Sequence, residues 1–232
     1  MRLGIVIPAL DEADHLAALL PEVLRRAPGA DLVVVDGGSR DATREIVARM
    51  PAARLLEAPR GRARQMNAGA RAVDGEALLF LHADTRLPDD AGAAIARALA
   101  DPQVVGGRFD VTFDSRRPLF RVIAWCMNQR SRLSGISTGD QAIFVRRAVF
   151  DAMGGFADIP LMEDIEFTRR LKRRGVLAPL DLRVTTSARK WEREGPWRTI
   201  VLMWALRLLY AAGASPDRLH RWYYRQPRRN PP

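Results

Sequence analysis

The sequence predicts an α/β fold in which a mostly parallel central sheet is covered by helices. Short apolar runs alternate with helical patterns at close spacing through the first hundred residues, which is typical of such sheets. Two of the apolar runs end in a carboxylate, at Asp36 and at Asp84. With 232 residues, of which 47% are hydrophobic, the chain is long enough to bury a full core as one domain.

Four short runs in the first half are expected to form strands, of which the run at 78–81 is expected to be buried on both faces. They occupy residues 3–7, 32–36, 53–56 and 78–81. A helical pattern follows each run, beginning near residues 11, 41, 61 and 88. Acidic residues open the first of these helices, as the helix dipole favours. Strands joined in this way run parallel through right-handed crossovers.

The regular alternation ends after Asp101. Further strands are expected at Val104–Phe113, 139–145 and Val176–Thr186, and helices at 118–133, 146–153 and 163–174. Residues 197–212 predict a long apolar helix, too short and too charged for a membrane span of about 20 residues. Residues 218–225 combine Arg with Trp and Tyr, which is typical of an interfacial anchor. The alternative is a helix that packs on the core or on a second subunit.

The positive charge is concentrated in the second half. Residues 1–115 carry 14 Arg and 17 Asp or Glu, whereas residues 116–232 carry 23 Lys or Arg and 10 Asp or Glu. Such a half could meet nucleic acid, anionic lipid or a phosphorylated substrate. A general preference for Arg on the surface is the alternative, because only Lys172 and Lys190 are lysines.

Cysteine usage and the N-terminus bear on the compartment. Cys126 is the single cysteine, which excludes a disulfide framework and a multi-cysteine zinc site. We therefore expect a reducing, cytoplasmic location. The first apolar run is too short for a signal peptide and is interpreted as a strand.

The strand ends supply the first candidate site. Asp36 and Asp84 lie at the carboxyl ends of expected parallel strands, where open α/β sheets bind ligands. Mg²⁺ and Mn²⁺ prefer carboxylate and phosphate oxygens and need only one or two protein carboxylates, so Asp84 is a metal-ligand candidate. His82 is a second candidate, and imidazole suits Mn²⁺ better than Mg²⁺. The alternatives are a helix N-cap for the aspartates and a buried, hydrogen-bonded histidine.

Other charged groups offer further chemistry. Glu163 and Asp164 could supply a general base, although acids also commonly open a helix. Arg60, Arg62 and Arg64, and the segment 190–193, could clamp phosphate oxygens or be ordinary surface groups. The chain has no Walker loop and no Gly-x-Gly-x-x-Gly fingerprint, which disfavours P-loop enzymes and dinucleotide oxidoreductases.

Six segments, taken in order, resemble one family. Residues 7–12 are similar to an opening Ile-Pro-x-x-Asn-Glu, residues 33–43 to Val-Asp-Asp-Gly-Ser-x-Asp-Gly-Thr, and residues 61–69 to a Gly/Ala/Asn segment. His82-Ala83-Asp84 stands at the position of an Asp-x-Asp motif. Gly139-Asp140-Gln141 and Met162-Glu163-Asp164 match a Gly turn and a Glu-Asp motif. Over about residues 3–195 the chain resembles the family 2 glycosyltransferases with the GT-A fold.

The resemblance implies a metal-dependent, inverting transfer of a sugar from a nucleoside-diphosphate sugar, with UDP favoured, to an unknown hydroxyl acceptor. It assigns nucleotide-sugar binding to Pro8, Glu12, Asp36, Gly38, Arg62, Asn67 and Asp84. Asp84, with His82 as a further candidate, would hold Mn²⁺ or Mg²⁺ on the diphosphate. Asp164 would be the general base, with Glu163 beside it. The acceptor side is assigned to Gly139, Asp140, Trp191 and Arg193.

The resemblance also implies an organisation. Residues 1–195 would form the GT-A domain, with a donor half at about 1–100 and an acceptor half at 101–195, and residues 196–232 a C-terminal amphipathic helical extension. The composition of that extension, outside the resemblance, predicts contact with an anionic membrane at the inner face or packing on the core or on a partner subunit, and no nucleic-acid partner is expected. His82 departs from the family's first Asp, and residues 187–191 only partly match Gln-x-x-Arg-Trp, which argues against processive synthesis.

Within the family, the chain looks most like a small bacterial subgroup named for arsenosugar biosynthesis and associated with radical-SAM genes. Its acceptor cannot be inferred from these residues. Two other functions stay open: a nucleotidyltransferase acting on sugar phosphates, and a basic membrane- or nucleic-acid-binding module with a degenerate site. The first would release pyrophosphate, and the second would bind no nucleotide sugar.

Overall fold

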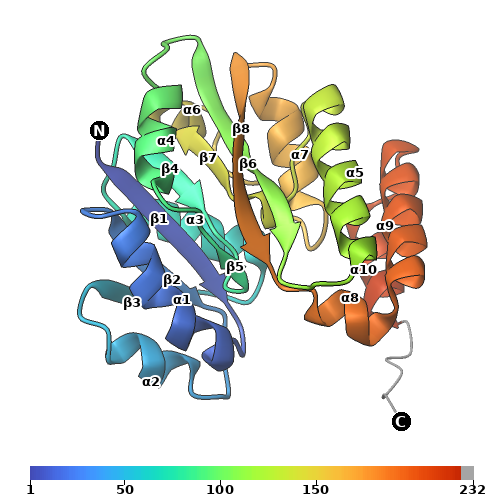
Figure 1. Cartoon of the computed structure of the whole chain (residues 1–232), viewed down its shortest axis with the longest axis horizontal. Coiled ribbons are helices and arrows are strands. Elements are labelled where there is room, and N and C mark those ends of the chain that lie inside the picture. Colours follow the sequence, from blue (N-terminus) through green and yellow to red (C-terminus); the bar gives the residue numbers. More distant parts are fainter. Residues whose placement is uncertain (226–232) are drawn as a thin grey trace.

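The computed structural model describes residues 1–225, which form one eight-stranded sheet with helices on both faces (Figure 1). The strands are β1 (Leu3–Ala9), β2 (Asp31–Asp36), β3 (Ala53–Glu57), β4 (Ala77–Phe80), β5 (Thr85–Arg86), β6 (Val104–Phe113), β7 (Ile143–Arg146) and β8 (Val176–Thr186). Their order across the sheet is β3-β2-β1-β4-β7-β6-β8-β5.

The helices follow the expected order with one addition, α8. They are α1 (Ala13–Arg26), α2 (Thr43–Ala48), α3 (Arg62–Ala72), α4 (Ala91–Ala98), α5 (Pro118–Ser134), α6 (Arg147–Ala152), α7 (Glu163–Leu171), α8 (Arg189–Glu194), α9 (Pro196–Ala211) and α10 (Pro216–Arg225). The sequence did not predict the short helix α8 or the two-residue strand β5. The strand expected at 139–145 is wrong in its first part, because Gly139–Gln141 form one turn of 3₁₀ helix before β7.

The first four strands pair in parallel, as predicted, so their carboxyl ends meet at one edge of the sheet. Strands β1, β2 and β4 are buried on both faces, whereas β3, at the edge of the sheet, is largely exposed. Ile5 and Leu79 pack with α1 in one apolar cluster, whereas Val6 and Leu78 pack with α3 in another. Two layers of helix therefore explain why these strands are continuous apolar runs.

The second half of the sheet changes direction. β7 is antiparallel to both of its neighbours, β4 and β6, while β6 and β8 run parallel over most of their length. Gly106 and Gly107 lie where β6 pairs with β7, and a Cβ at Gly107 would overlap Ala178 O of β8. Side chains at this point would push the strands apart, which explains the glycine pair.

The C-terminal helices pack against the domain. Leu206 of α9 and Leu219 of α10 are buried in a cluster with Met162 and Ile165 beside α7. Ile200 connects α9 to the cluster around α5, and the two helices lie side by side in Figure 1. None of the helices within residues 1–225 combines the length and hydrophobicity needed to cross a membrane. The last seven residues of the expected extension, 226–232, lie outside the described residues.

Candidate active site

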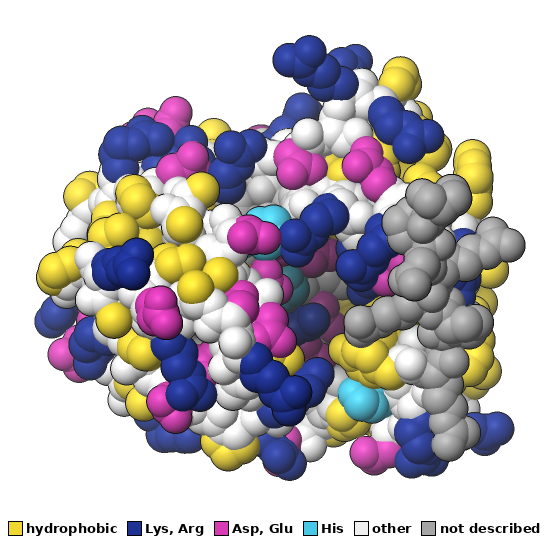
Figure 2. Space-filling model, turned by 90° about the horizontal axis from the view of Figure 1, so that it is seen from below, with side chains coloured by type: hydrophobic (Ala, Val, Ile, Leu, Met, Phe, Trp, Pro, Cys, Tyr) yellow, Lys and Arg dark blue, Asp and Glu magenta, His cyan; other side chains and the backbone are white. Residues whose placement is uncertain are grey.

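A cavity of about 940 Å³ opens at the edge where β1 and β4 end. Figure 2 views the molecule from this edge and shows a central hollow with acidic, basic and His side chains. The loop after β1, the start of α3, the segment after β4, the approach to α7, and α10 all line it. Six residues that the sequence assigned to the site line this cavity: Pro8, Glu12, Arg62, His82, Asp84 and Glu163. Asp217, His220 and Tyr224, to which the sequence assigned no role, also line it.

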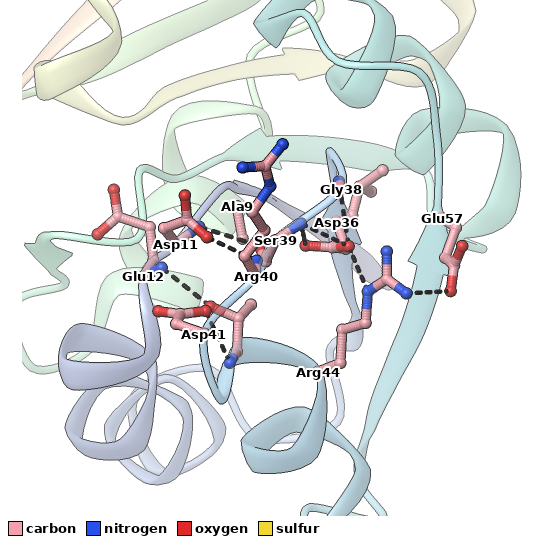
Figure 3. A network of polar contacts seen from close by, with 12 residues as sticks. Ala9, Asp11, Glu12, Asp36, Gly38, Ser39, Arg40, Asp41, Arg44 and Glu57 are labelled. Atoms are coloured by element: carbon pink, nitrogen blue, oxygen red, sulfur yellow. Dashed lines mark hydrogen bonds and ion pairs between the residues drawn. The ribbon is translucent and has the colours of Figure 1, made fainter.

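The loops after β1 and β2 hold each other through backbone-to-side-chain hydrogen bonds (Figure 3). Asp11 N donates to Ser39 Oγ at 2.9 Å, and Arg40 N donates back to Asp11 Oδ1 at 2.7 Å. Glu12 N donates to Thr43 Oγ1 at 2.9 Å. These bonds fix the main chain at Glu12, whose side chain reaches the cavity.

Asp36 is completely buried and organises the turn that follows β2 (Figure 3). Its carboxylate accepts bonds from Gly38 N and Ser39 N at 3.1 Å and from Arg44 Nε at 2.7 Å. Burial alone would raise its pKa, but the bonds from Ser39 and Arg44 outweigh burial and hold that pKa below its usual value. Arg44 also pairs with Glu57 at 3.1 Å. Neither Asp36 nor Gly38 lines the cavity.

Gln65 is a structural residue that sequence reasoning missed. Its buried Nε2 donates to Ala9 O and to Val35 O, both at 2.8 Å, and so ties the ends of β1 and β2 together. A Cβ at Gly37 would lie 2.9 Å from the same nitrogen. The amide thus occupies the space that a side chain at Gly37 would need, where the family pattern has its second Asp.

Asn67 and Arg62 join α3 to the second half of the chain. Asn67 Nδ2 donates to Phe156 O at 2.8 Å, and Phe156 N donates to Asn67 Oδ1 at 2.9 Å. This pairing uses the Asn67 amide, which does not line the cavity. Arg62 does line it and pairs with the buried Glu163 at 3.2 Å. The negative charge of Glu163 raises the pKa of Arg62.

Glu12 and Asp84 bring two acids together in the cavity. Burial, and next the charge of Asp84, raise the pKa of Glu12 to about 7. Glu12 Oε2 is buried and accepts no hydrogen bond within residues 1–225. A divalent cation would offset the repulsion between the two carboxylates and would give Glu12 Oε2 a partner, so the carboxylates of Glu12 and Asp84 fit Mg²⁺ or Mn²⁺. No three His, Cys, Asp or Glu side chains of the described chain form a complete metal centre, so such a cation would also need ligand oxygens.

His82 faces the acceptor-side turn. Its Nδ1 lies 3.2 Å from Asp140 Oδ1, and a Cβ at Gly139 would overlap its Nε2. Burial alone would raise the pKa of Asp140, but the hydrogen bond with His82 and the positive charge of Arg62 help to outweigh burial and lower it. The glycine at 139 therefore makes room for the imidazole ring.

Asp164 lies at the start of α7, behind the same turn. Gly139 N donates to its Oδ2 at 2.9 Å and Ile165 N to its Oδ1 at 2.7 Å. Burial, followed by the negative charge of Glu163, raises the pKa of Asp164 to about 6. The carboxylate is ionised at neutral pH and is basic enough to accept a proton. The turn at Gly139 and Asp140 thus connects Asp164 to the His82–Asp84 segment.

The two remaining acceptor-side candidates, Trp191 and Arg193, lie on α8. Like Gly139, Asp140 and Asp164, they are not among the residues that line the cavity. Trp191 packs edge-on against Phe113, with ring centroids 5.6 Å apart, and Arg193 pairs with Glu194 at 3.7 Å. Helix α10, rather than α8, forms part of the cavity wall, through Asp217, His220 and Tyr224. Its Arg-Trp-Tyr composition gave no signal that separates a cavity wall from a surface anchor.

The fold and the site together define the class of protein. An open α/β sheet carries acidic groups and a large polar cavity at the carboxyl ends of its parallel strands, the arrangement of a nucleotide-binding α/β protein. The model of the family described as Glycosyl transferase family 2 matches residues 4–157. The chain therefore belongs to glycosyl transferase family 2. No curated protein matches the chain.

Solved structures share the GT-A fold at low sequence identity. S. aureus TarS 1–349 in complex with UDP has a TM-score of 0.64 and 17% identity, covering 81% of this chain and 60% of that one. Its complex with UDP-GlcNAc gives 0.63 and 17%, covering 81% and 58%. The mannosyltransferase PcManGT from Pyrobaculum calidifontis, in complex with GDP-Man and Mn²⁺, gives 0.67 and 22%, covering 100% and 66%. The chain thus spans about three fifths of the TarS structures.

Proposed function

We propose that the protein is a metal-dependent, inverting glycosyltransferase that moves a sugar from a nucleoside-diphosphate sugar to a hydroxyl acceptor. One observation carries the proposal. The Gly139–Asp140 turn hydrogen-bonds Asp164, a carboxylate whose pKa is raised to about 6, and contacts His82, two residues before Asp84. One turn therefore contacts both the proposed base and the segment that carries the proposed metal ligand.

The donor would occupy the cavity beside the end of β1. A volume of about 940 Å³ is ample for a nucleotide sugar. Arg60, Arg62 and Arg64 line it and can offer hydrogen bonds and positive charge to diphosphate oxygens. The similar structures hold UDP, UDP-GlcNAc or GDP-Man, which supports a nucleotide sugar, with UDP favoured here.

Asp84, with Glu12 beside it, would hold Mn²⁺ or Mg²⁺. When bound, the cation would neutralise charge that develops on the leaving diphosphate. His82 is engaged with Asp140, so we assign it to shaping the turn rather than to ligation. Asp36, buried in its own hydrogen bonds, would act by positioning the nucleotide-side loop.

Asp164 would accept the proton of the acceptor hydroxyl. A single attack on the face opposite the leaving group inverts the anomeric carbon, and no residue has to form a covalent intermediate. Glu163 pairs with Arg62 and raises the pKa of Asp164, so its role is to tune the base. Non-processive transfer, an arsenosugar or related small-molecule or lipid glycoside as product, and a cytoplasmic location stay predictions.

Asp164→Asn tests the assignment of the base. The substitution keeps the size of the side chain and removes its ability to take a proton, so transfer should fall by about 10²-fold or more. Because an amide has only one acceptor oxygen, it also gives up one of the two bonds from Gly139 N and Ile165 N. Binding of UDP, measured by the thermal shift that a native-state ligand produces, should stay near normal. Loss of UDP binding together with transfer would reassign Asp164 to folding or to donor contact.

A further inference from the structure

Helix α9 is apolar on its outer face as well as on its inner face. Its inner side is buried through Leu206. Trp197, Val201, Trp204 and Leu208 recur at the spacing of one helical face and are 70%, 68%, 57% and 64% exposed. A helix that is hydrophobic all round normally has both sides covered. The outer side of α9 is thus a surface that lacks a cover within residues 1–225.

The neighbouring helix α5 adds to this surface. It packs beside α9, with Ile200 of α9 in the apolar cluster around Ile123, and exposes Val122 and Trp125 at 57% and 62%. Single exposed apolar residues are ordinary, but a group of this size marks an interaction site. We call Val122, Trp125, Trp197, Val201, Trp204 and Leu208 the α5–α9 face.

The charge around the α5–α9 face indicates which kind of partner binds this face. Residues 196–225 contain five Arg and one acidic residue, Asp217. On α5, Arg121 is exposed, whereas Arg130 is turned inward and Arg132 pairs with Asp110 and Asp181. A second copy of the chain would bring like charges together, which disfavours self-association. An anionic lipid surface complements the arginines, and Trp prefers the depth of the lipid headgroups.

We propose that the α5–α9 face docks on the surface of a bilayer that contains anionic lipid. The helices lie on the membrane without crossing it, with the tryptophans at headgroup depth. Helix α10 packs on α9 through Leu219 and Leu206 and also lines the cavity through His220 and Tyr224, so docking places the cavity one helix away from the bilayer. Docking requires neither donor nor acceptor and is measured independently of the function proposed above.

Vesicle binding tests the proposal with the full chain. Sedimentation with phosphatidylcholine vesicles is compared with sedimentation with vesicles that also contain phosphatidylserine. We expect at least about tenfold tighter binding to the anionic vesicles and weaker binding as salt is raised. Equal binding to both vesicles, or binding to neither, would overturn the proposal.

A matched pair of variants locates the surface. The triple change Trp197→Ser, Val201→Ser, Trp204→Ser should weaken binding to anionic vesicles by at least about tenfold. Val176→Ser changes a half-exposed apolar residue at the start of β8 and should bind like the wild type. Unchanged circular dichroism and UDP binding show that the triple variant is folded. Full vesicle binding by that variant, or a wild-type dimer in sedimentation equilibrium that the triple change abolishes, would refute docking through this face.

Discussion

Replacing Glu12 with Gln should stabilise the folded protein at neutral pH. In the fold, burial and then the negative charge of Asp84 raise the pKa of Glu12 from 4.5 to about 7. Its Oε2 is buried and accepts no hydrogen bond within the described chain. The bond from Glu12 N to Thr43 Oγ1 uses the main chain, so Gln retains it. The substitution removes an unfavourable charge, and with it a contact of 4.0 Å between Glu12 Oε2 and His15 Nε2.

The magnitude follows from the proton affinities of the folded and unfolded chains. A pKa raised from 4.5 to about 7 limits the gain in the free energy of unfolding of Glu12→Gln to ~3 kcal/mol, at ~1.4 kcal/mol per pKa unit. The Glu12 side chain is 30% exposed, so water stabilises part of the charge and we expect ~1–2 kcal/mol.

The pH dependence has a definite sign. Well below pH 4.5 both the folded and the unfolded chain hold the Glu12 proton, and the variant gains nothing. Between pH 4.5 and about 7 only the unfolded chain has released it, so wild-type stability falls relative to the variant as pH rises. Above that window the gain is complete and constant.

Urea unfolding without metal or nucleotide measures this difference at pH 5 and pH 8. Glu12→Gln should be more stable than the wild type by ~1–2 kcal/mol at pH 8 and by well under half of that at pH 5. Glu45→Gln, at an exposed position on α2, is the control and should show no such gain. A gain of equal size at both pH values, or a loss at pH 8, would refute the proposed strain between Glu12 and Asp84.

Three further predictions test the base and the packing. The transfer rate of the wild type should fall about tenfold for each pH unit below pH 6, because Asp164, with its pKa raised to about 6, then holds a proton; a flat profile down to pH 5 would exclude it as the base. Gly69→Ala should cost roughly 1–3 kcal/mol in urea unfolding, since its Cβ would overlap Val6 of β1, whereas Gly92→Ala in α4 meets only ordinary contacts and should be neutral or stabilising. Gln65→Leu should cost about 1–3 kcal/mol by removing the side-chain hydrogen bonds to Ala9 O and Val35 O, of which Ala9 O keeps its bond from Gly37 N, and wild-type stability would contradict its tying role.

The parallel half of the fold could be predicted because β1, β2 and β4 bury both faces and appear in the sequence as apolar runs, whereas the edge strand β3 is largely exposed. Residues 139–145 misled the prediction because the turn is set by a distant partner, Asp164, which accepts the Gly139 N–H. Strand β5 has only two residues and exists through pairing with β8, and no local pattern marks it. Local chemistry thus specified elements whose stabilising contacts are periodic, and tertiary contacts specified the rest.

The candidate site divides in the same way. His82, Asp84 and Asp164 stand at strand or helix ends, where position alone suggested chemistry. Asn67 was predicted as a nucleotide contact, yet its amide is paired with Phe156, 89 residues away, and that pairing has no sequence signal. The wall formed by α10 depends likewise on how a C-terminal helix folds back over the cavity.

Product analysis tests the central claim most directly. The purified chain is incubated with UDP-sugars in the presence and absence of Mn²⁺, and the released nucleotide is identified. We expect release of UDP that depends on the metal and is abolished in Asp84→Ala, because the proposed role of that carboxylate is to hold the cation on the diphosphate. Consumption of UTP and a sugar phosphate with release of pyrophosphate, or full activity in Asp84→Ala, would contradict it.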